Sequence, residues 1–571
     1  MNKKLVWVVA ALVVAIGAGA IYYFFVKDRN QHLKYIPAEV TMAVHFDLKS
    51  LRDKSDFEKV KKMKFFTELM DEHSHDGSNH EFTDVLLKKP LTAGIDVLSD
   101  PIFFMSTRND KMFMGLSIKL TSSGDFNRLV KKYKTAAEPK KSDTYTSLEL
   151  EEEKLFVAWN DEAAVFLSSP NLMNRSNSKA EIEKVLDIYM TQETKESLSE
   201  NEDYHKFRKE KQDIGIFITY DKLFDFVGSA LNSRRYYSQE MMDTKEQMDK
   251  MKEKFKGIKA GLTLSFESNA LMGKILMYGE NATKLMEQSG YTGKALSADF
   301  IKTISNDKIL ATLFFNYNMD KLIDYQLENP KYKEAINKFA EDLNMTVSDL
   351  KSILGGEFAF SLVDAEVLKE EKKYIDIDPI TEEPIDKTRT VETPMPYFTI
   401  SLSVKNDANL QKLVDNINKK MTPDFDTADA VHHAIEKRGA NHYFKKNNVE
   451  ISMIKTAIGY TITNSPKIAE ALSKNKSLSS DPKLIGKEYF NNNSFGFKII
   501  LDTEKYPKTF IDYLKTQTRG EKTPWDILKN FKEISMQMPV GSTIEGKFEV
   551  KMTEGKGNSL YRLLEMIDEA K

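Results

Sequence analysis

The chain has 571 residues with 83 basic and 86 acidic side chains, a formal net charge of −3 and no cysteine. Charges of both signs are interspersed, which argues against a nucleic-acid binder with its basic stripe and against a polyacidic surface. The lack of cysteine excludes disulfides, thiolate metal sites and a lipid-modified N-terminal cysteine. A chain of this length can bury the cores of two or more domains without disulfides.

Residues 5–26 form an uncharged, apolar run that predicts a transmembrane signal anchor. At about 1.5 Å per residue such a helix reaches roughly 33 Å, and a hydrocarbon core is about 30 Å thick. Two lysines in the stub 1–4 predict a cytoplasmic N terminus, with the ectodomain in the periplasm or outside the cell. The alternative is a signal peptide cleaved after Ala20, although the apolar run continues past that site.

After a linker over 27–34, five stretches recur in the same order, each roughly 270–295 residues further along the chain. The pairs are 42–47 with 311–316, 114–119 with 398–403, 164–170 with 459–466, 214–221 with 495–502, and 262–266 with 546–550. This recurrence predicts a tandem duplication, with one ectodomain repeat over 35–290 and a second over 291–571.

Strand and helix signals alternate within the first repeat. An alternating apolar stretch at 41–48 precedes an amphipathic helix signal over 56–72. Two strand-like runs, 101–107 and 111–120, are separated by three polar residues, which is typical of a hairpin. We therefore predict an α+β fold class: an N-terminal transmembrane helix followed by two tandem copies of an antiparallel-sheet-plus-helices domain.

The second repeat differs by an insertion over 370–396 that is rich in acidic residues, threonine and proline. We predict that this insertion interrupts a hairpin and is mobile. Asp47, Asp221 and Asp502, together with Asn316, end equivalent strands just before helix signals. Acidic and amide side chains at such junctions are typical of helix N-caps, so we expect them to serve folding.

The strongest candidate for chemistry is a polar segment with three of the nine histidines. Together with neighbouring carboxylates, His73, His75 and His80 offer ligands for zinc or another transition metal. A metal-dependent hydrolase is therefore one hypothesis, and a polar loop without chemistry is the other, because no spacing matches H-E-x-x-H. The pair His432-His433 and the nearby His442 form a sparser second group.

Other catalytic signatures are missing from the sequence. It has no G-x-S-x-G elbow, no S-x-x-K with its partner motifs and no phosphate-binding glycine loop. Enzymatic activity stays uncertain, with the balance toward a non-enzymatic role, and no cofactor is predicted.

The segment Tyr35–Leu51 reads YIPAEVTMAVHFDLKSL. It resembles the opening of a Bacteroidota family of uncharacterised envelope proteins, classed as a domain of unknown function. Members open with an Ile-Pro step, a short strand and a D-x-x-S-L turn into a helix. The resemblance implies an exported envelope protein and brings no activity and no catalytic residues. Many members look like lipoproteins, and this chain lacks the cysteine that such anchoring needs.

Three hypotheses follow for function. The first is a membrane-anchored protein, held by residues 5–26, that binds or scaffolds another envelope component and has an envelope protein partner but no nucleic acid. The second is a carrier of an apolar ligand or lipid held between a sheet and its helices, with some of the 34 phenylalanines and 25 methionines around it. The third is the hydrolase that uses the histidines of residues 73–80.

Overall fold

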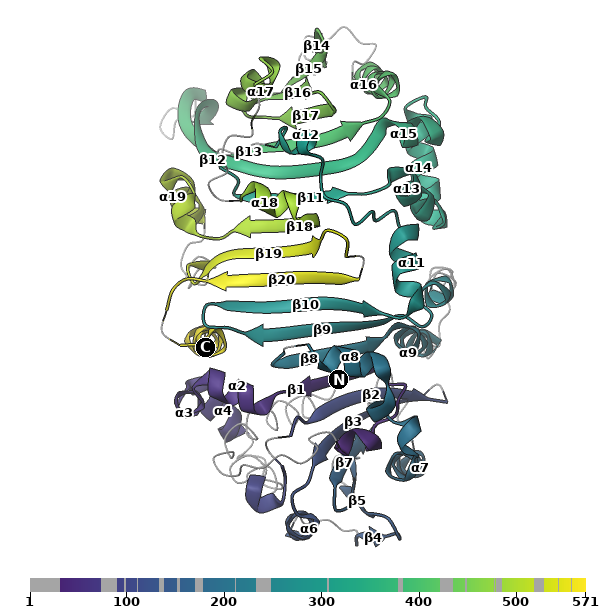
Figure 1. The fold of residues 1–571 in the computed structure, drawn as a ribbon. Coiled ribbons are helices and arrows are strands. Elements are labelled where there is room, and N and C mark those ends of the chain that lie inside the picture. The colour runs from purple at the N-terminus through teal and green to yellow at the C-terminus, as the bar shows by residue number, and fades with distance from the viewer. Residues whose placement is uncertain are drawn as a thin grey trace. The chain divides into compact units, whose positions relative to one another are not determined.

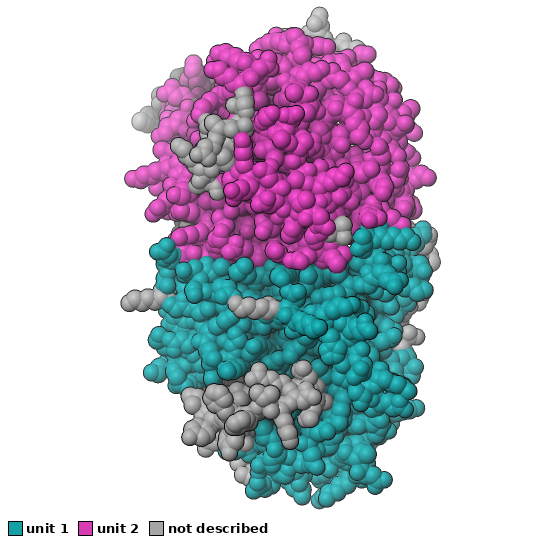
Figure 2. Space-filling model, viewed as in Figure 1, with its two compact units in different colours: residues 1–285, 554–571 teal, residues 286–553 magenta. Residues whose placement is uncertain are grey.

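The chain divides into two compact units, which have different colours in Figure 2. Unit 1 comprises Met1–Leu285 and Glu554–Lys571, and unit 2 comprises Met286–Thr553. The structure, a computed structural model, describes residues 31–570 except for several internal segments. Those segments are 73–89, 97–98, 110, 133–137, 151–154, 170–177, 211, 233–247, 305–307, 378–383, 422–434, 447–448, 477, 479–484, 518–527, 543 and 556.

Unit 1 is built on one antiparallel sheet (Figure 1). Its strands pair in the order β4-β5-β6-β7-β3-β2-β1-β8-β9-β10. They are β1 (Met42–Phe46), β2 (Ile102–Arg108), β3 (Lys111–Lys119), β4 (Lys140–Lys141), β5 (Thr146–Leu150), β6 (Leu155–Trp159), β7 (Ala163–Ser168), β8 (Ile214–Thr219), β9 (Lys259–Phe266) and β10 (Ala270–Tyr278). Strands β1, β2 and β8 alternate buried and half-buried residues, as strands with one closed face do, whereas β6 and β7 are buried throughout.

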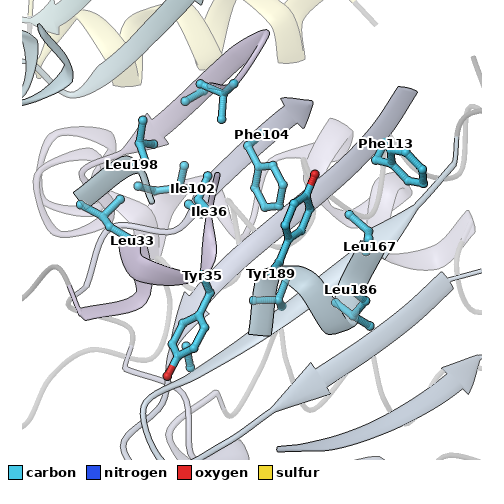
Figure 3. Close-up of a cluster of buried hydrophobic side chains, with 14 of the residues drawn as sticks. Leu33, Tyr35, Ile36, Ile102, Phe104, Phe113, Leu167, Leu186, Tyr189 and Leu198 are labelled. Carbon is cyan, nitrogen blue, oxygen red and sulfur yellow. The ribbon is translucent and has the colours of Figure 1, made fainter. Parts of the chain in front are cut away.

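Helical segments close one face of this sheet. They are η1 (Gln31–Tyr35), α7 (Lys179–Thr191), η6 (Leu198–Glu200) and α8 (Glu202–Arg208). The helix α7 begins at Ser178, where a reciprocal capping box with Glu181 satisfies free backbone N–H groups. Figure 3 shows part of the core that results: the ring centroids of Tyr189 and Phe104 lie 5.9 Å apart, and the Tyr189 hydroxyl is 2.6 Å from the Ser106 hydroxyl.

On the other face, helices cover only part of the sheet. The segments η2 (Pro90–Ala93) and α6 (Ser123–Lys132) pack over strands β3, β5, β6 and β7. Phe126 of α6 is fully buried there against Trp159, with ring centroids 5.7 Å apart. The remaining helices of unit 1 include α2 (Leu48–Ser55), α3 (Phe57–Val60), α4 (Lys64–Glu72) and α9 (Tyr220–Asn232).

The C-terminal helix α21 (Ser559–Ala570) completes unit 1. Its residues Tyr561 and Leu564 pack on an apolar cluster from α3, α4 and the turn between them: Phe57, Val60, Met63 and Phe66. Ser559 is fully buried, and its backbone N–H donates to Glu267 O at 3.0 Å. Residues distant in sequence therefore form one hydrophobic core.

Unit 2 has the same pairing order as unit 1. Its strands run β14-β15-β16-β17-β13-β12-β11-β18-β19-β20, all antiparallel. They are β11 (Ala311–Asn316), β12 (Leu354–Ile377), β13 (Pro384–Val404), β14 (Glu436–Arg438), β15 (Asn441–Lys446), β16 (Val449–Lys455), β17 (Gly459–Thr463), β18 (Asn493–Ile500), β19 (Phe531–Pro539) and β20 (Glu545–Met552). Each strand of unit 2 thus has a counterpart ten labels earlier in unit 1.

The helices of unit 2 cover its sheet unevenly. The short helices α12 (Ala298–Ile301) and α18 (Lys487–Asn491) close one face over β11, β12 and β18. The helix α17 (Pro466–Ser473) packs on β16. The helices α15 (Val347–Ile353) and α16 (Asp407–Met421) pack over the end of the sheet formed by β13, β16 and β17. In Figure 1, α13 (Met319–Leu327), α14 (Pro330–Asp342) and α15 lie at one end of the central strands, and α19 (Lys508–Gln517) lies at the other.

The predicted insertion over 370–396 is largely paired β-structure. Strands β12 and β13 continue as a ladder from Asp364–Tyr397 to Ile377–Pro384. Residues 378–383 at the tip lie outside the described part, so mobility of the insertion stays a prediction.

Four of the five recurring stretches lie on strands with the same place in the two pairing orders. They lie on β1 and β11, β3 and β13, β7 and β17, and β8 and β18. The fifth match is wrong, because residues 262–266 lie on β9 whereas residues 546–550 lie on β20, the counterpart of β10. The two final strands are neighbours in a hairpin and share their alternation, so sequence pattern alone cannot separate them.

The expected strand-end caps occur at two of the four positions. Asp47 caps α2 by accepting the Ser50 N–H at 2.8 Å, and Asp502 caps a short 3-10 helix. Asp221 instead lies inside the first turn of α9, and the cap of α13 is Asn318 rather than Asn316.

The structure has the predicted antiparallel sheets with helices, but the predicted fold class is wrong in two other respects. In the described part of the chain, no helix is long and apolar enough to cross a membrane. The predicted span over residues 5–26 lies outside that part. The remainder is not two consecutive copies either, because α21 returns to unit 1 after the last strand of unit 2.

Candidate functional site

One face of the unit 2 sheet carries a row of large apolar side chains across seven strands. Pairing registers place them directly opposite one another on successive strands: Phe548, Met536, Phe497, Leu313, Phe360, Ile400 and Ile462. At about 4.8 Å per strand, the row extends for roughly 29 Å. All seven side chains are half-buried, and none belongs to a hydrophobic core of the described residues.

Two flanking rows widen this apolar face. One consists of Val550, Ile534, Ile499, Ala311, Leu362 and Phe398. The other consists of Met538, Phe495, Phe315, Phe358 and Leu402. Within the second row, Phe315 and Phe358 stack with ring centroids 4.9 Å apart and an interplanar angle of 15°. We call the three rows together the apolar face.

The opposite face of the same sheet carries the apolar core under α12 and α18, and beside it a set of buried hydroxyl groups. Small hydroxyl side chains form a cross-strand row there: Thr312, Ser361, Thr399, Thr463 and Ser452. All five are buried. The Thr312 hydroxyl donates to Phe360 O at 3.0 Å, and the Thr463 hydroxyl donates to Phe398 O at 2.7 Å. On this face, backbone carbonyl groups accept hydrogen bonds from the buried hydroxyl groups. The large apolar side chains of the apolar face stay partly accessible.

Helices α15 and α16 cover only one end of the apolar face. Their side chains form a core with Leu402, Tyr460 and Met453, at the β13, β16 and β17 end of the sheet. The apolar side chains of β11, β18, β19 and β20 are outside this core. This leaves a partly accessible apolar surface with a sheet as its floor.

Unit 1 has the same row at equivalent positions. It consists of Ile275, Leu262, Ile216, Val44 and Phe103, and continues into Leu116 and Phe166. The last two are buried under α6, whereas the first five are at most partly buried, with Ile275 at 36% exposure. Over the first five positions, the row of unit 2 has three aromatic side chains and the row of unit 1 has one.

A second feature, found in unit 1, is a group of buried polar side chains under the closed face. His45 is 2% exposed and Tyr204 is fully buried, and neither His45 Nδ1 nor the Tyr204 hydroxyl has a hydrogen-bond partner within the described residues. His32 donates its Nε2–H to Asp100 O at 2.9 Å. The Arg208 guanidinium pairs with the Asp100 carboxylate at 2.7 Å.

Burial determines the protonation state of these histidines. It lowers the pKa of His32 from 6.5 to about 4, although the hydrogen bond to the Asp100 carbonyl opposes the change. Burial also lowers the pKa of His45 well below its ordinary value, and the positive charge of Arg208 acts in the same direction. Both imidazoles are therefore neutral at neutral pH.

The His45 ring occupies the space above a glycine. A Cβ on Gly215 would lie 2.1 Å from His45 Cε1 and 2.4 Å from Gln212 Oε1. In unit 2 the equivalent pair is Phe314 over Gly496, where a Cβ would lie 2.3 Å from the ring. Unit 1 thus holds an imidazole where unit 2 holds a phenyl ring.

The predicted metal site stays a prediction, because its histidines lie in segments that the structure does not describe. His73, His75 and His80 lie outside the described residues, as do His432 and His433. His442 is 4% exposed on β15, and burial lowers its pKa. Across the described residues, no group of three or more His, Asp or Glu side chains could hold a metal ion.

Comparison with known proteins places the chain in a family. Residues 33–511 match the model described as Domain of unknown function (DUF4836). The chain belongs to this family. The family match begins in η1 and ends in α19. It therefore includes most strands of the apolar face in unit 2 and all strands of the equivalent row in unit 1. Neither a curated protein nor a solved structure matches the chain.

Membership in the DUF4836 family adds no catalytic or binding function. The apolar face was not found from sequence, because alternation shows that a strand has two faces without showing which face helices will cover. One usable signal was present: the same strands alternate small hydroxyl residues with phenylalanine, isoleucine and leucine.

Proposed function

We propose that this protein is a non-catalytic binding protein whose apolar face in unit 2 holds an acyl-chain ligand such as a fatty acid or lipid. The observation that supports the proposal is the set of three half-buried apolar rows on one sheet face. Each methylene group of a chain buried there would contribute about 0.8 kcal/mol. Lipid is itself an envelope component, so the proposal joins the first two hypotheses drawn from the sequence.

The chemistry of the face favours an acyl chain over a protein surface. Ordinary protein interfaces have about one hydrogen bond per 100–200 Å². The three rows offer only Phe, Met, Leu, Ile, Val and Ala side chains, which neither donate nor accept. An acyl chain needs no hydrogen bond, and flexible methionines adapt to its shape.

A duplication of the sheet-forming segments and the extracytoplasmic location stay predictions. The duplication is supported by the identical pairing order of the strands in unit 1 and unit 2. The envelope location is supported by the resemblance of the opening segment and by the uncharged run near the N terminus.

A charge-insertion variant tests the proposed ligand. In the double variant Leu313→Glu/Phe497→Glu, two carboxylates enter the centre of the apolar face, and burying them under an acyl chain is strongly unfavourable. We expect displacement titrations with a fluorescent fatty acid to show affinity that is at least roughly tenfold weaker. Native mass spectrometry of the full chain should also show loss of any co-purified lipid.

The matched control is Lys547→Glu, which changes the net charge by the same amount. Lys547 is exposed and adjacent to Phe548 on β20, but it points to the opposite face. It should bind the fatty acid like the unmodified protein. Equal binding by all three proteins, or no binding by any of them, would rule out the proposed ligand.

A further inference from the structure

The hairpin β12–β13 extends well beyond the sheet of unit 2. Residues 367–377 and 384–394 pair only with each other in the described structure, and we call them the arm. The neighbouring strands stop earlier: β11 pairs with β12 over 357–362, and β17 pairs with β13 over 399–403. The equivalent hairpin of unit 1 has strands of only 7 and 9 residues. The arm therefore belongs to unit 2 alone.

The arm lacks a hydrophobic core of its own. Side chains of residues 371–375 are all exposed, and Ile375 at 72% is the most exposed large apolar residue described. Isolated two-stranded hairpins are at best marginally stable in water. Cross-strand ion pairs add little at such exposure: Lys369 with Glu392 at 2.9 Å and Lys387 with Asp376 at 2.7 Å. A structure of this kind gains stability when a partner covers it.

One side of the arm carries three basic side chains, Lys372, Lys387 and Arg389, and two acidic ones, Glu370 and Asp376. Lys372 and Arg389 are directly opposite each other in the ladder. Directly opposed like charges destabilise a strand pair, because their Cβ atoms lie only about 5 Å apart. Neither side chain has a carboxylate partner among the described residues, and Arg389 instead lies over the Tyr374 ring at 5.6 Å. A carboxylate placed between them would remove the repulsion.

Apolar groups accompany these cations on the same side of the ladder. Tyr374 is 39% exposed, and Ile385 and Val391 are half-buried on the partner strand. Two opposed cations that form no ion pair among the described side chains, with flanking apolar side chains, match an extended peptide that alternates acidic and apolar residues.

We propose that this side of the arm binds an acidic, extended segment of a partner protein, with its carboxylates between Lys372 and Arg389. A polyphosphate chain fits less well, because Asp376 already neutralises Lys387 and the reverse side carries Glu371, Asp386 and Glu392. A second copy of the arm that docked through this same side would present the same two cations and be repelled. This docking site is distinct from the apolar face and does not depend on the acyl-chain proposal.

A defined peptide pair tests this docking site on the full chain. The probes are a short labelled peptide of alternating glutamate and valine, and its counterpart with lysine in place of glutamate. Fluorescence anisotropy should show binding of the acidic peptide only. The double variant Lys372→Glu/Arg389→Glu should weaken that binding by at least roughly tenfold. Bound peptide should also slow hydrogen exchange of backbone amides in residues 384–394.

The matched control is Lys419→Glu/Lys420→Glu. These lysines are exposed on α16 of the same unit, and the change in net charge is identical. The control should bind the acidic peptide like the unmodified protein. The proposal is overturned if both peptides bind equally, if the arm variant binds as well as the control, or if the arm mediates self-association without binding peptide.

Discussion

At the scale of single residues, the neutral histidines of unit 1 link its stability to pH. The pKa of His32 is about 4 in the folded protein and 6.5 when the side chain is free. As the pH falls, His32 therefore binds a proton near pH 6.5 in the unfolded chain but only near pH 4 in the folded chain. Stability is fully present above pH 6.5 and falls as the pH drops through this window, by on the order of 3 kcal/mol for His32. His45 acts in the same direction.

Replacement of His45 by phenylalanine tests this linkage. His45→Phe copies the ring that unit 2 places at the equivalent position, so it preserves the contact over Gly215. We expect its midpoint of urea unfolding to fall less steeply than that of the unmodified protein between pH 6.5 and pH 4.5. Free carboxyl groups titrate mostly below this window, which separates their effect. Parallel pH profiles for the two proteins would contradict a role for the His45 imidazole.

Residue-level reasoning from sequence succeeded where the interaction is local. Asp47 caps α2 because its acceptor group and the free N–H groups are only three residues apart. The role of His45 was not predicted, although the alternation of residues 42–46 places His45 and Val44 on different faces of the strand. The histidines predicted to bind a metal occur together in a polar segment, whereas His45 is a single histidine on an apolar strand.

At the scale of elements, the C-terminal helix stabilises helices near the other end of the chain. Leu564 of α21 contacts the cluster of Phe57, Val60, Met63 and Phe66, and Asp568 accepts the Phe65 N–H at 2.7 Å. The variant Leu564→Ser should expose this cluster and speed hydrogen exchange throughout residues 48–68. The cost should be about 2 kcal/mol, at the low end of large-to-small changes in cores, because Leu564 is only partly buried.

The control for this prediction lies one turn away on the same helix. Ile567 is 50% exposed, so Ile567→Ser removes a similar side chain without opening the cluster. Its exchange rates should match those of the unmodified protein. If Leu564→Ser also leaves exchange in 48–68 unchanged, α21 does not stabilise these helices.

Sequence patterns predicted elements unevenly for physical reasons. The strands β1, β8, β11 and β18 were found because period-two alternation reports a half-closed sheet. The helix predicted over 56–72 is two helices, α3 and α4, since the chain turns between Val60 and Lys64. The paired strands of the arm were not predicted, because exposed β-ribbons carry charged residues and prolines that resemble loops.

At the scale of the whole molecule, the division into units follows chain connectivity that no local pattern records. Unit 2 is one continuous stretch, whereas unit 1 needs residues from both ends of the chain. The recurrence of strands predicted two similar halves, and the pairing order is the same in each. It could not predict that residues 554–571 return to unit 1, because that depends on tertiary contacts rather than on periodicity.

This connectivity makes the two units unequal as isolated proteins. A protein of residues 286–553 keeps all ten strands of the unit 2 sheet and the hydrophobic cores that pack on it. We therefore expect circular dichroism to show cooperative thermal unfolding of this protein.

A protein of residues 31–285 lacks α21 and exposes the apolar surface of α3 and α4, which should make residues 48–68 sensitive to protease. Adding a peptide of residues 554–571 should restore protection, because Asn558 and Ser559 still find Phe266 and Ala270 as hydrogen-bond partners. A peptide with Leu564 replaced by serine is the control, and protection by both peptides alike would mean that the apolar contact is not what joins the two ends of the chain.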